Sequence, residues 1–151
     1  MLKRLKEMRD NKKGFTLVEL IVVLVILAIL AALLIPALTG YIDKAREKQI
    51  TAETRQVVMA AQTLADEEYA KDGDGAITLD TAATTVPDPR AAHTVYRCEV
   101  AALAEIKEVG NINGITFNDG KVAEVVYVSG GKTCTYTEAD GQYVITETSN
   151  P

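Results

Sequence analysis

The chain has 151 residues, with 16 Lys and Arg against 21 Asp and Glu, a net charge of −5 and 48% hydrophobic residues. This length allows one soluble domain and an anchor. The acidic excess argues against direct nucleic-acid binding, because phosphate contacts need clustered Lys and Arg. The single histidine, and a sequence without a Ser/His/Asp set, metal-ligand cluster or phosphate loop, argue against an enzyme or a bound cofactor.

Residues 1–14 form a basic leader. They carry six Lys and Arg against two Asp and Glu, a net charge of +4, so the rest of the chain has a net charge of −9. Positive charge in front of an apolar segment keeps that end of the chain cytoplasmic. We therefore expect the residues after the apolar segment to face outward from the cell.

The segment that follows is long enough to cross a membrane. All sixteen residues from Leu20 to Ile35 are Leu, Ile, Val or Ala. With its flanks, residues 15–38, it would form a helix of about 36 Å, against a hydrocarbon core of roughly 30 Å. A secretory signal peptide has a shorter apolar run, followed by a small-x-small cleavage site. The longer run, without such a site behind it, favours a retained anchor over residues 15–40.

One ionisable residue, Glu19, lies at the start of this segment. A charged side chain inside a membrane helix is costly, so it is a candidate for a functional role. The alternative is a glutamate tolerated at the membrane surface, because the dipole of the helix favours a carboxylate in the first turn.

The residues around Glu19 form a recognisable motif. Gly14, Phe15 and Glu19 stand in the sequence KKGFTLVEL, after the basic leader and before the apolar run. This arrangement resembles the processing site of type IV prepilins. The resemblance implies that a prepilin peptidase cuts between Gly14 and Phe15 and that the new amine of Phe15 is methylated. It also implies that Glu19 pairs with the N-terminal amine of a neighbouring subunit and sets the assembly register.

The same resemblance implies a structural role. The mature protein would be a subunit of a type IV pilus, a helical homopolymer drawn from the membrane as a reservoir by an assembly platform protein and a motor ATPase. It would start as a single-pass membrane precursor and end in an extracellular filament. The alternatives are a pseudopilin of a type II secretion or DNA-uptake system, and a membrane-anchored monomeric binding module.

Residues 15–72 are predicted to form one helix, kinked at Pro36 because proline lacks an N–H and crowds the preceding turn. Within residues 41–72, one helical face carries Ile50, Val57, Ala61 and Leu64. We expect this half to be the spine of a head spanning residues 41–151, and the apolar half to project. Gly73 is a typical helix stop.

Residues 73–110 are predicted to form a loop and a second helix. The loop covers residues 76–94, and the helix runs from Val95 to Glu108. Its expected inner face is formed by Val95, Cys98, Ala102 and Ile106.

Acidic residues at the start of the loop are candidates for calcium binding. Asp72, Asp74 and Asp80 are candidate ligands, but their spacing does not match an EF-hand loop. A plain acidic turn is the alternative, in which Asp80 caps the residues that follow it.

Residues 111–148 are predicted to form four antiparallel strands in a meander, because β-rich runs alternate with Asp-Gly and Gly-Gly turn signals. Side chains of equal parity in the strands should face the spine helix. They are Ile115, Phe117, Val125, Tyr127, Cys134 and Tyr136. The fold class is therefore predicted as α+β, a pilin-like long helix packed on a four-stranded sheet.

The chain contains two cysteines, Cys98 and Cys134. In an exported chain they are expected to form one disulfide, which would join the second helix to the sheet. Two buried free thiols are the alternative.

Overall fold

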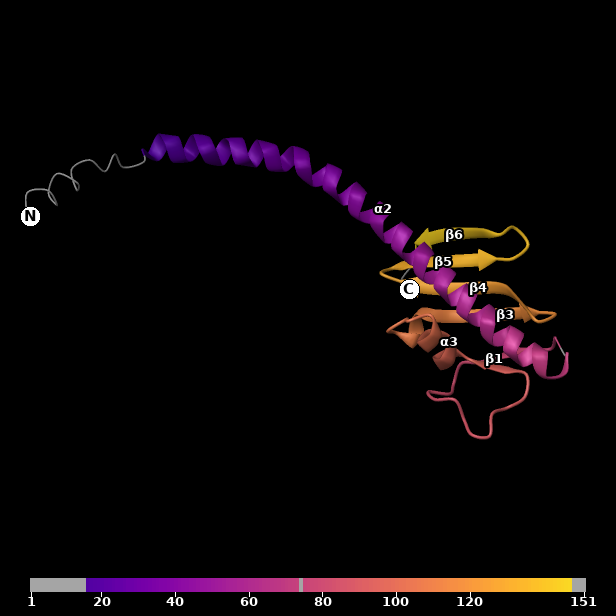
Figure 1. The fold of residues 1–151 in the computed structure, drawn as a ribbon. Helices are drawn as coiled ribbons and strands as arrows, with labels where there is room; N and C mark the ends of the chain where they lie inside the picture. The colour runs from indigo at the N-terminus through magenta and orange to yellow at the C-terminus, as the bar shows by residue number, and fades with distance from the viewer. Residues whose placement is uncertain (1–15, 74, 148–151) are drawn as a thin grey trace, which may run out of the picture. The chain divides into compact units, whose positions relative to one another are not determined.

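The computed structural model describes residues 16–73 and 75–147, without the side chain of Asp72. The elements, in chain order, are the following: α2 (Leu17–Asp72), β1 (Thr78–Asp80), β2 (Thr94–Tyr96), α3 (Arg97–Leu103), the 3-10 turn η1 (Val109–Asn111), β3 (Ile112–Asn118), β4 (Lys121–Ser129), β5 (Lys132–Thr137) and β6 (Gln142–Glu147) (Figure 1). The chain divides into two units, the first ending at Ile42 and the second, the head, beginning at Asp43.

In the first unit, α2 leaves its apolar side chains exposed. Its large hydrophobic residues are between 44% exposed, at Ile42, and 73% exposed, at Leu17 and Tyr41. An 18-residue window of α2 has a mean hydropathy of 3.3, which makes the helix long and apolar enough to cross a membrane. The helix continues through Pro36, whose carbonyl accepts a hydrogen bond of 2.9 Å from the hydroxyl of Thr39. The predicted kink at Pro36 remains a prediction.

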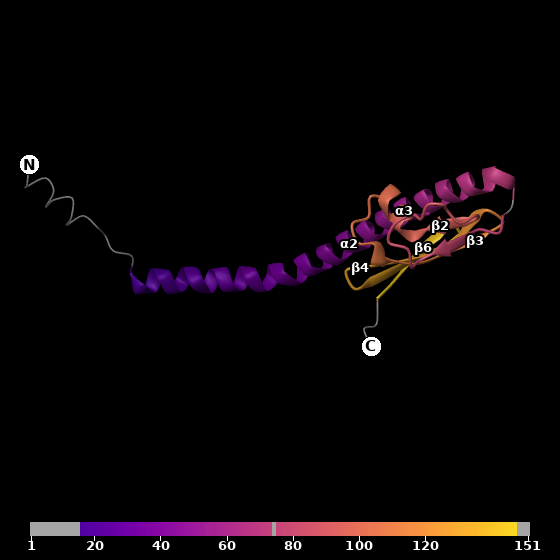
Figure 2. The ribbon, with the colours of Figure 1, turned by 90° about the horizontal axis from the view of Figure 1, so that it is seen from below.

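In the head, α2 packs across one face of the four-stranded sheet (Figures 1 and 2). Ile50, Val57, Ala61 and Leu64 are each at most 4% exposed, which confirms the predicted spine face. The helix ends as predicted, because Gly73 adopts a φ of 77° and its N–H bonds to the carbonyl of Tyr69.

The sheet has the order β3-β4-β5-β6 with antiparallel neighbours, which confirms the predicted meander. The β3–β4 turn places Asp119 and Gly120 at φ of 50° and 76°, as a tight hairpin turn requires. The six side chains predicted to face the spine belong to the core or pack against it. The α+β, pilin-like fold class is therefore confirmed.

The segment between α2 and the sheet differs from the prediction. The predicted loop contains a parallel strand pair, β1 and β2, with Leu79 opposite Val95. The second helix, α3, begins only at Arg97, because Val95 and Tyr96 belong to β2. The buried face of the helix also differs from the predicted one. Val100 and Ala101 are buried, whereas Ala102, which was predicted to face the core, is exposed.

The end of α3 was also predicted wrongly. The helix stops at Leu103, before the predicted end at Glu108, because Glu105 adopts a left-handed φ of 56°. The N–H of Glu105 bonds to the carbonyl of Ala102 and that of Ile106 to the carbonyl of Ala101, a Schellman closure. Glycine is the usual residue at the left-handed position of this motif. Because glutamate stands there in this chain, the end of the helix could not be recognised from the sequence.

The predicted disulfide is not formed. Both thiols are free; Cys98 is half-buried and Cys134 is fully buried in the sheet, opposite Tyr127 and Ile145. The physical reason lies in the altered face of α3. Val100 and Ala101 are buried where Cys98 was expected, whereas Cys98 is only half-buried and does not belong to the core cluster that contains Cys134.

Candidate functional site

The candidate assembly site lies at the first turn of α2, where Thr16 and Glu19 cap the helix together. Oε2 of Glu19 accepts a hydrogen bond from the backbone N–H of Thr16 (2.9 Å) and another from its hydroxyl (2.8 Å). In return, the backbone N–H of Glu19 donates to the hydroxyl oxygen of Thr16 at 3.3 Å. This reciprocal pattern is a capping box, which satisfies N–H groups that a helix start leaves unpaired.

This capping box was not predicted, although the sequence contains its signal, a threonine followed three positions later by a glutamate. Both bonds from Thr16 go to a single carboxylate oxygen, so Glu19 keeps acceptor capacity for a second partner. The carboxylate is thus held at the rim of an exposed apolar helix, among neighbours such as Leu17 and Leu20 that are more than half exposed.

The two residues of the predicted cleavage junction, Gly14 and Phe15, lie outside the described residues. The comparison with protein families bears on them directly. The sequence model described as the prokaryotic N-terminal methylation motif matches residues 9–35, which include this junction, Glu19 and the whole apolar run from Leu20 to Ile35.

The chain carries a prepilin-type methylation motif.

With its fold, this motif makes the chain a type IV pilin-like or pseudopilin-like protein. The motif implies processing by a prepilin peptidase, and with the apolar helix it indicates a membrane-anchored precursor. No curated protein and no solved structure gives a significant match to the chain.

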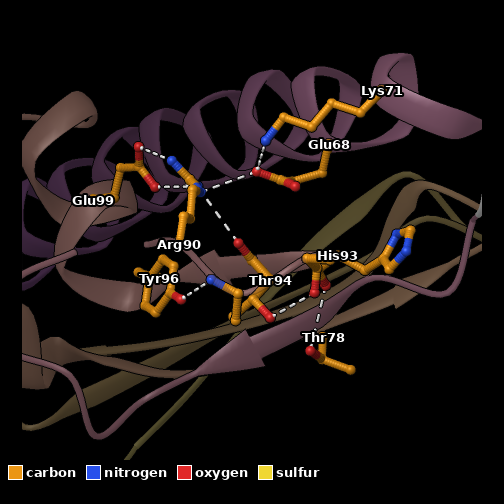
Figure 3. A network of polar contacts seen from close by, with 10 residues as sticks. Glu68, Lys71, Thr78, Arg90, His93, Thr94, Tyr96 and Glu99 are labelled. Carbon is orange, nitrogen blue, oxygen red and sulfur yellow. Dashed lines mark hydrogen bonds and ion pairs between the residues drawn. The ribbon is translucent and has the colours of Figure 1, made fainter. Parts of the chain in front are cut away.

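In the head of this pilin-like chain, a buried ionic network joins α2 to the segment before β2 (Figure 3). The carboxylate of Glu68 is 2% exposed and lies 3.0 Å from Nε of Arg90 and 2.6 Å from Nζ of Lys71. The guanidinium of Arg90 also donates two hydrogen bonds to Glu99, of 3.0 and 2.7 Å. Arg90 therefore bridges a carboxylate of α2 and a carboxylate of α3.

Two further contacts fix the position of Arg90. Its guanidinium carbon lies 5.4 Å from the centre of the buried ring of Tyr96, whose hydroxyl accepts a hydrogen bond from the N–H of Ala91 (Figure 3). The hydrogen bonds to Glu99 raise the pKa of Arg90 further, so the guanidinium stays charged. The sequence contains no local signal for the contacts of Arg90, because Arg90 and Glu99 lie 22 and 31 positions after Glu68.

The structure gives no support to the calcium candidates. Oδ1 of Asp80 accepts hydrogen bonds from the N–H groups of Ala82 (2.7 Å) and Ala83 (3.0 Å). Asp74 and the side chain of Asp72 lie outside the described residues. Among the residues that the structure describes, no group of three or more His, Cys, Asp or Glu is placed to hold a metal ion.

A second contact in the head, which is partly buried, joins the sheet to α2. The hydroxyl of Tyr127, a residue only 2% exposed, donates a hydrogen bond of 2.9 Å to Glu53. Burial raises the pKa of Tyr127, and the hydrogen bond to Glu53 raises it further. The folded head therefore holds this phenolic proton more tightly than the unfolded chain does.

This difference predicts a loss of stability at alkaline pH. The stabilisation is fully present below about pH 10, the usual tyrosine pKa, and falls as the pH rises toward the higher pKa of the folded state. Tyr127→Phe should cost about 1 kcal/mol near neutral pH, from the lost hydrogen bond, and should flatten the fall above pH 10. Thermal unfolding between pH 8 and about pH 11 measures both effects.

The exposed Tyr41 supplies the control. Tyr41→Phe removes a phenol that is 73% exposed and should leave the alkaline slope as in the wild type. An unchanged slope in Tyr127→Phe would contradict the assignment to the Tyr127–Glu53 contact.

Proposed function

We propose that this protein is the structural subunit of a type IV pilus and that it polymerises through its N-terminal helix. The observation that carries the proposal is the methylation motif at residues 9–35 joined to an apolar helical segment, residues 17–42 of α2, whose side chains are all exposed. A helix with this surface must be covered by lipid or by other helices. The membrane would cover it before assembly, and neighbouring subunits would cover it in the filament.

Glu19 would set the register of this assembly. Inside a bundle of helices without water, a carboxylate needs a charged partner, and the methylated amine of Phe15 in a neighbouring subunit would supply one. The capping box supports this role, because Thr16 holds the carboxylate of Glu19 in a defined position at the helix end. A contact between different surfaces of identical subunits, repeated without closure, gives a helical filament.

The partners of the precursor and mature forms would be a prepilin peptidase, an assembly platform protein and a motor ATPase. A pseudopilin is the alternative within the same family of machines, since it shares the motif and the apolar helix. Electron microscopy of sheared cell-surface material, with mass spectrometry of the subunit, tests the proposal. Long fibres composed of this chain support a pilus, and their absence from the surface contradicts it.

Processing gives a separate prediction. The mature chain should begin at Phe15 and carry one methyl group on its amine. Gly14→Leu should leave an uncut precursor in the membrane, because a branched side chain would obstruct a peptidase site shaped for glycine. Intact-mass analysis of the membrane fraction measures both. Gly14→Ala, the smallest change at the same position, is the matched control and should be cut at least in part. A chain that starts after the apolar run would contradict the prediction.

A further inference from the structure

The head begins with a cluster of exposed cations, directly after the segment that is long and apolar enough to cross a membrane. Lys44, Arg46 and Lys48 are all exposed, and within the described part of the chain none of them forms an ion pair. We call these three residues the cationic collar. One exposed carboxylate, that of Asp43, lies beside them.

The cationic collar is a local exception in an acidic chain, because the residues after the leader have a net charge of −9. The neighbouring carboxylate of Glu47 already lies 3.1 Å from Nζ of Lys132, so it does not neutralise the collar. Lys44 and Lys48 are also four positions apart on one face of α2, where like charges repel each other. An anion from outside the chain would relieve this repulsion.

The collar lies at the level of the lipid headgroups. Twenty helical residues, from Leu20 to Thr39, cross a hydrocarbon core of about 30 Å. Because α2 continues without a break, Lys44 follows about 7.5 Å further along the helix and Lys48 one turn later. The headgroup layer on each side of the core is roughly 5–8 Å thick. Long lysine side chains can turn toward this layer and place their ammonium groups in it.

Cations on this side of the membrane oppose the usual distribution of charge. Lys and Arg close to a membrane segment favour the cytoplasmic side, and the leader already carries six of them. The collar belongs to the end of the segment that is expected to face outward, where its charge weakens the orientation signal. This placement indicates that the positive charge has a role at the outer surface of the membrane.

The collar also borders a groove of about 540 Å³ beside β6, which Lys44 and Lys48 line together with Arg55. The far end of this groove is different. Met59 lies fifteen positions, about 22 Å, along α2 from Lys44, and it also borders the hollow that Glu105 lines. The positive end of the groove is therefore the end nearest the membrane segment.

We infer that the cationic collar binds the phosphate groups of anionic phospholipids in the outward leaflet and holds the head of the unassembled subunit at the membrane surface. Charge complementarity and continuity with the membrane segment carry this inference. Each Lys or Arg close to an anionic membrane strengthens binding about fivefold. The contact goes beyond the proposed filament, because it concerns the subunit in the membrane before assembly and requires only the anchor.

Chemical labelling of the full-length chain tests the contact. A neutral amine-reactive ester is applied to the protein in nanodiscs of pure phosphatidylcholine and in nanodiscs with about one third phosphatidylglycerol, and mass spectrometry of the peptides gives the rate at each lysine. Lys44 and Lys48 should react about fivefold more slowly in the anionic nanodiscs. The exposed Lys71, at the far end of α2, and Lys121, in the turn that packs there, should react at nearly equal rates in both. Salt at about 0.5 M should remove the protection of Lys44 and Lys48 by screening.

Two double variants with equal changes in charge locate the effect. Lys44→Gln with Lys48→Gln removes two charges of the collar, whereas Lys71→Gln with Lys121→Gln removes two charges far from it. Native mass spectrometry of each chain in detergent, with equal amounts of the two lipids, measures the phosphatidylglycerol that is retained. The collar variant should retain about half as much as the wild type or less, and the control variant should retain the wild-type amount. Lys44→Arg with Lys48→Arg keeps the charge and should keep the lipid. The leader is the same in every chain, so its cations do not affect the comparison.

Three results would overturn the inference. The first is equal labelling of Lys44 and Lys48 in the two kinds of nanodisc. The second is undiminished retention of phosphatidylglycerol by the collar variant. The third is equal protection of both lysines by inorganic phosphate in detergent without lipid, which would identify a site for a free anion instead. None of these results bears on filament formation, which the sheared cell-surface material reports separately.

Discussion

Glu19→Gln should leave normal amounts of processed subunit in the membrane and abolish or strongly reduce filaments. The apolar length that controls insertion is unchanged. The capping box also survives, because a glutamine at this position can accept the same hydrogen bond from the N–H of Thr16. The substitution therefore removes only the charge. In the filament it would leave the Phe15 ammonium of a neighbour buried without a counter-charge, at about 3–5 kcal/mol for every subunit.

The shear fraction, quantified against the membrane fraction, measures this effect. Glu19→Asp should give an intermediate yield, since the charge remains and its reach shortens by one methylene. Thr16→Ala is the complementary control, because it removes the hydroxyl of the capping box and keeps the charge of Glu19. It should cost about 1 kcal/mol in local helix stability and retain most filaments. Wild-type filament yield from Glu19→Gln would contradict the register role.

Arg90→Met should lower the stability of the head by about 3 kcal/mol, the low end for breaking a buried ion pair. Methionine keeps much of the apolar stem against Tyr96 but leaves the carboxylate of Glu68, which is 2% exposed, without its guanidinium. Lys71 remains 2.6 Å from Glu68, which is why the low end applies. For a domain of this size, the melting temperature should fall by on the order of 15 °C.

Two controls separate the buried pair from ordinary surface charge. Lys71→Met removes a partner that is 57% exposed and should cost no more than about 1 kcal/mol. Glu68→Gln combined with Arg90→Met should be more stable than Arg90→Met alone, because no buried charge is left uncompensated. Thermal unfolding of the wild type and these three variants in detergent measures the differences in stability. Equal losses from Arg90→Met and Lys71→Met would contradict the buried role of Arg90.

The network also has a local consequence for the segment that precedes β2. Arg90 connects this segment to α2 and α3, and the N–H of Ala91 is held by the hydroxyl of Tyr96. Amide exchange at Ala91 should therefore accelerate in Arg90→Met well before the sheet loses protection, since local openings cost less than global unfolding.

Local patterns in the sequence determined the helix, the sheet and the motif. The spacing of Ile50 and Val57, the glycine stop at Gly73 and the Asp-Gly and Gly-Gly turns each depend on neighbouring residues, and the structure has all of them where expected. The methylation motif is local as well, and the comparison with protein families recovered it at residues 9–35. Hydrophobic periodicity and turn residues depend on a few neighbouring positions, so they can be recognised in the sequence without knowledge of the fold.

Tertiary structure decided the middle of the chain. The strand pair β1–β2 joins residues 16 positions apart, and its three residues per strand are too few for a periodic signal. The side of α3 that faces the core follows from the packing of Val100 and Ala101, and it leaves Cys98 half-buried. The buried Glu68–Arg90 pair arises only when distant segments meet on α2, because burial depends on the folded chain.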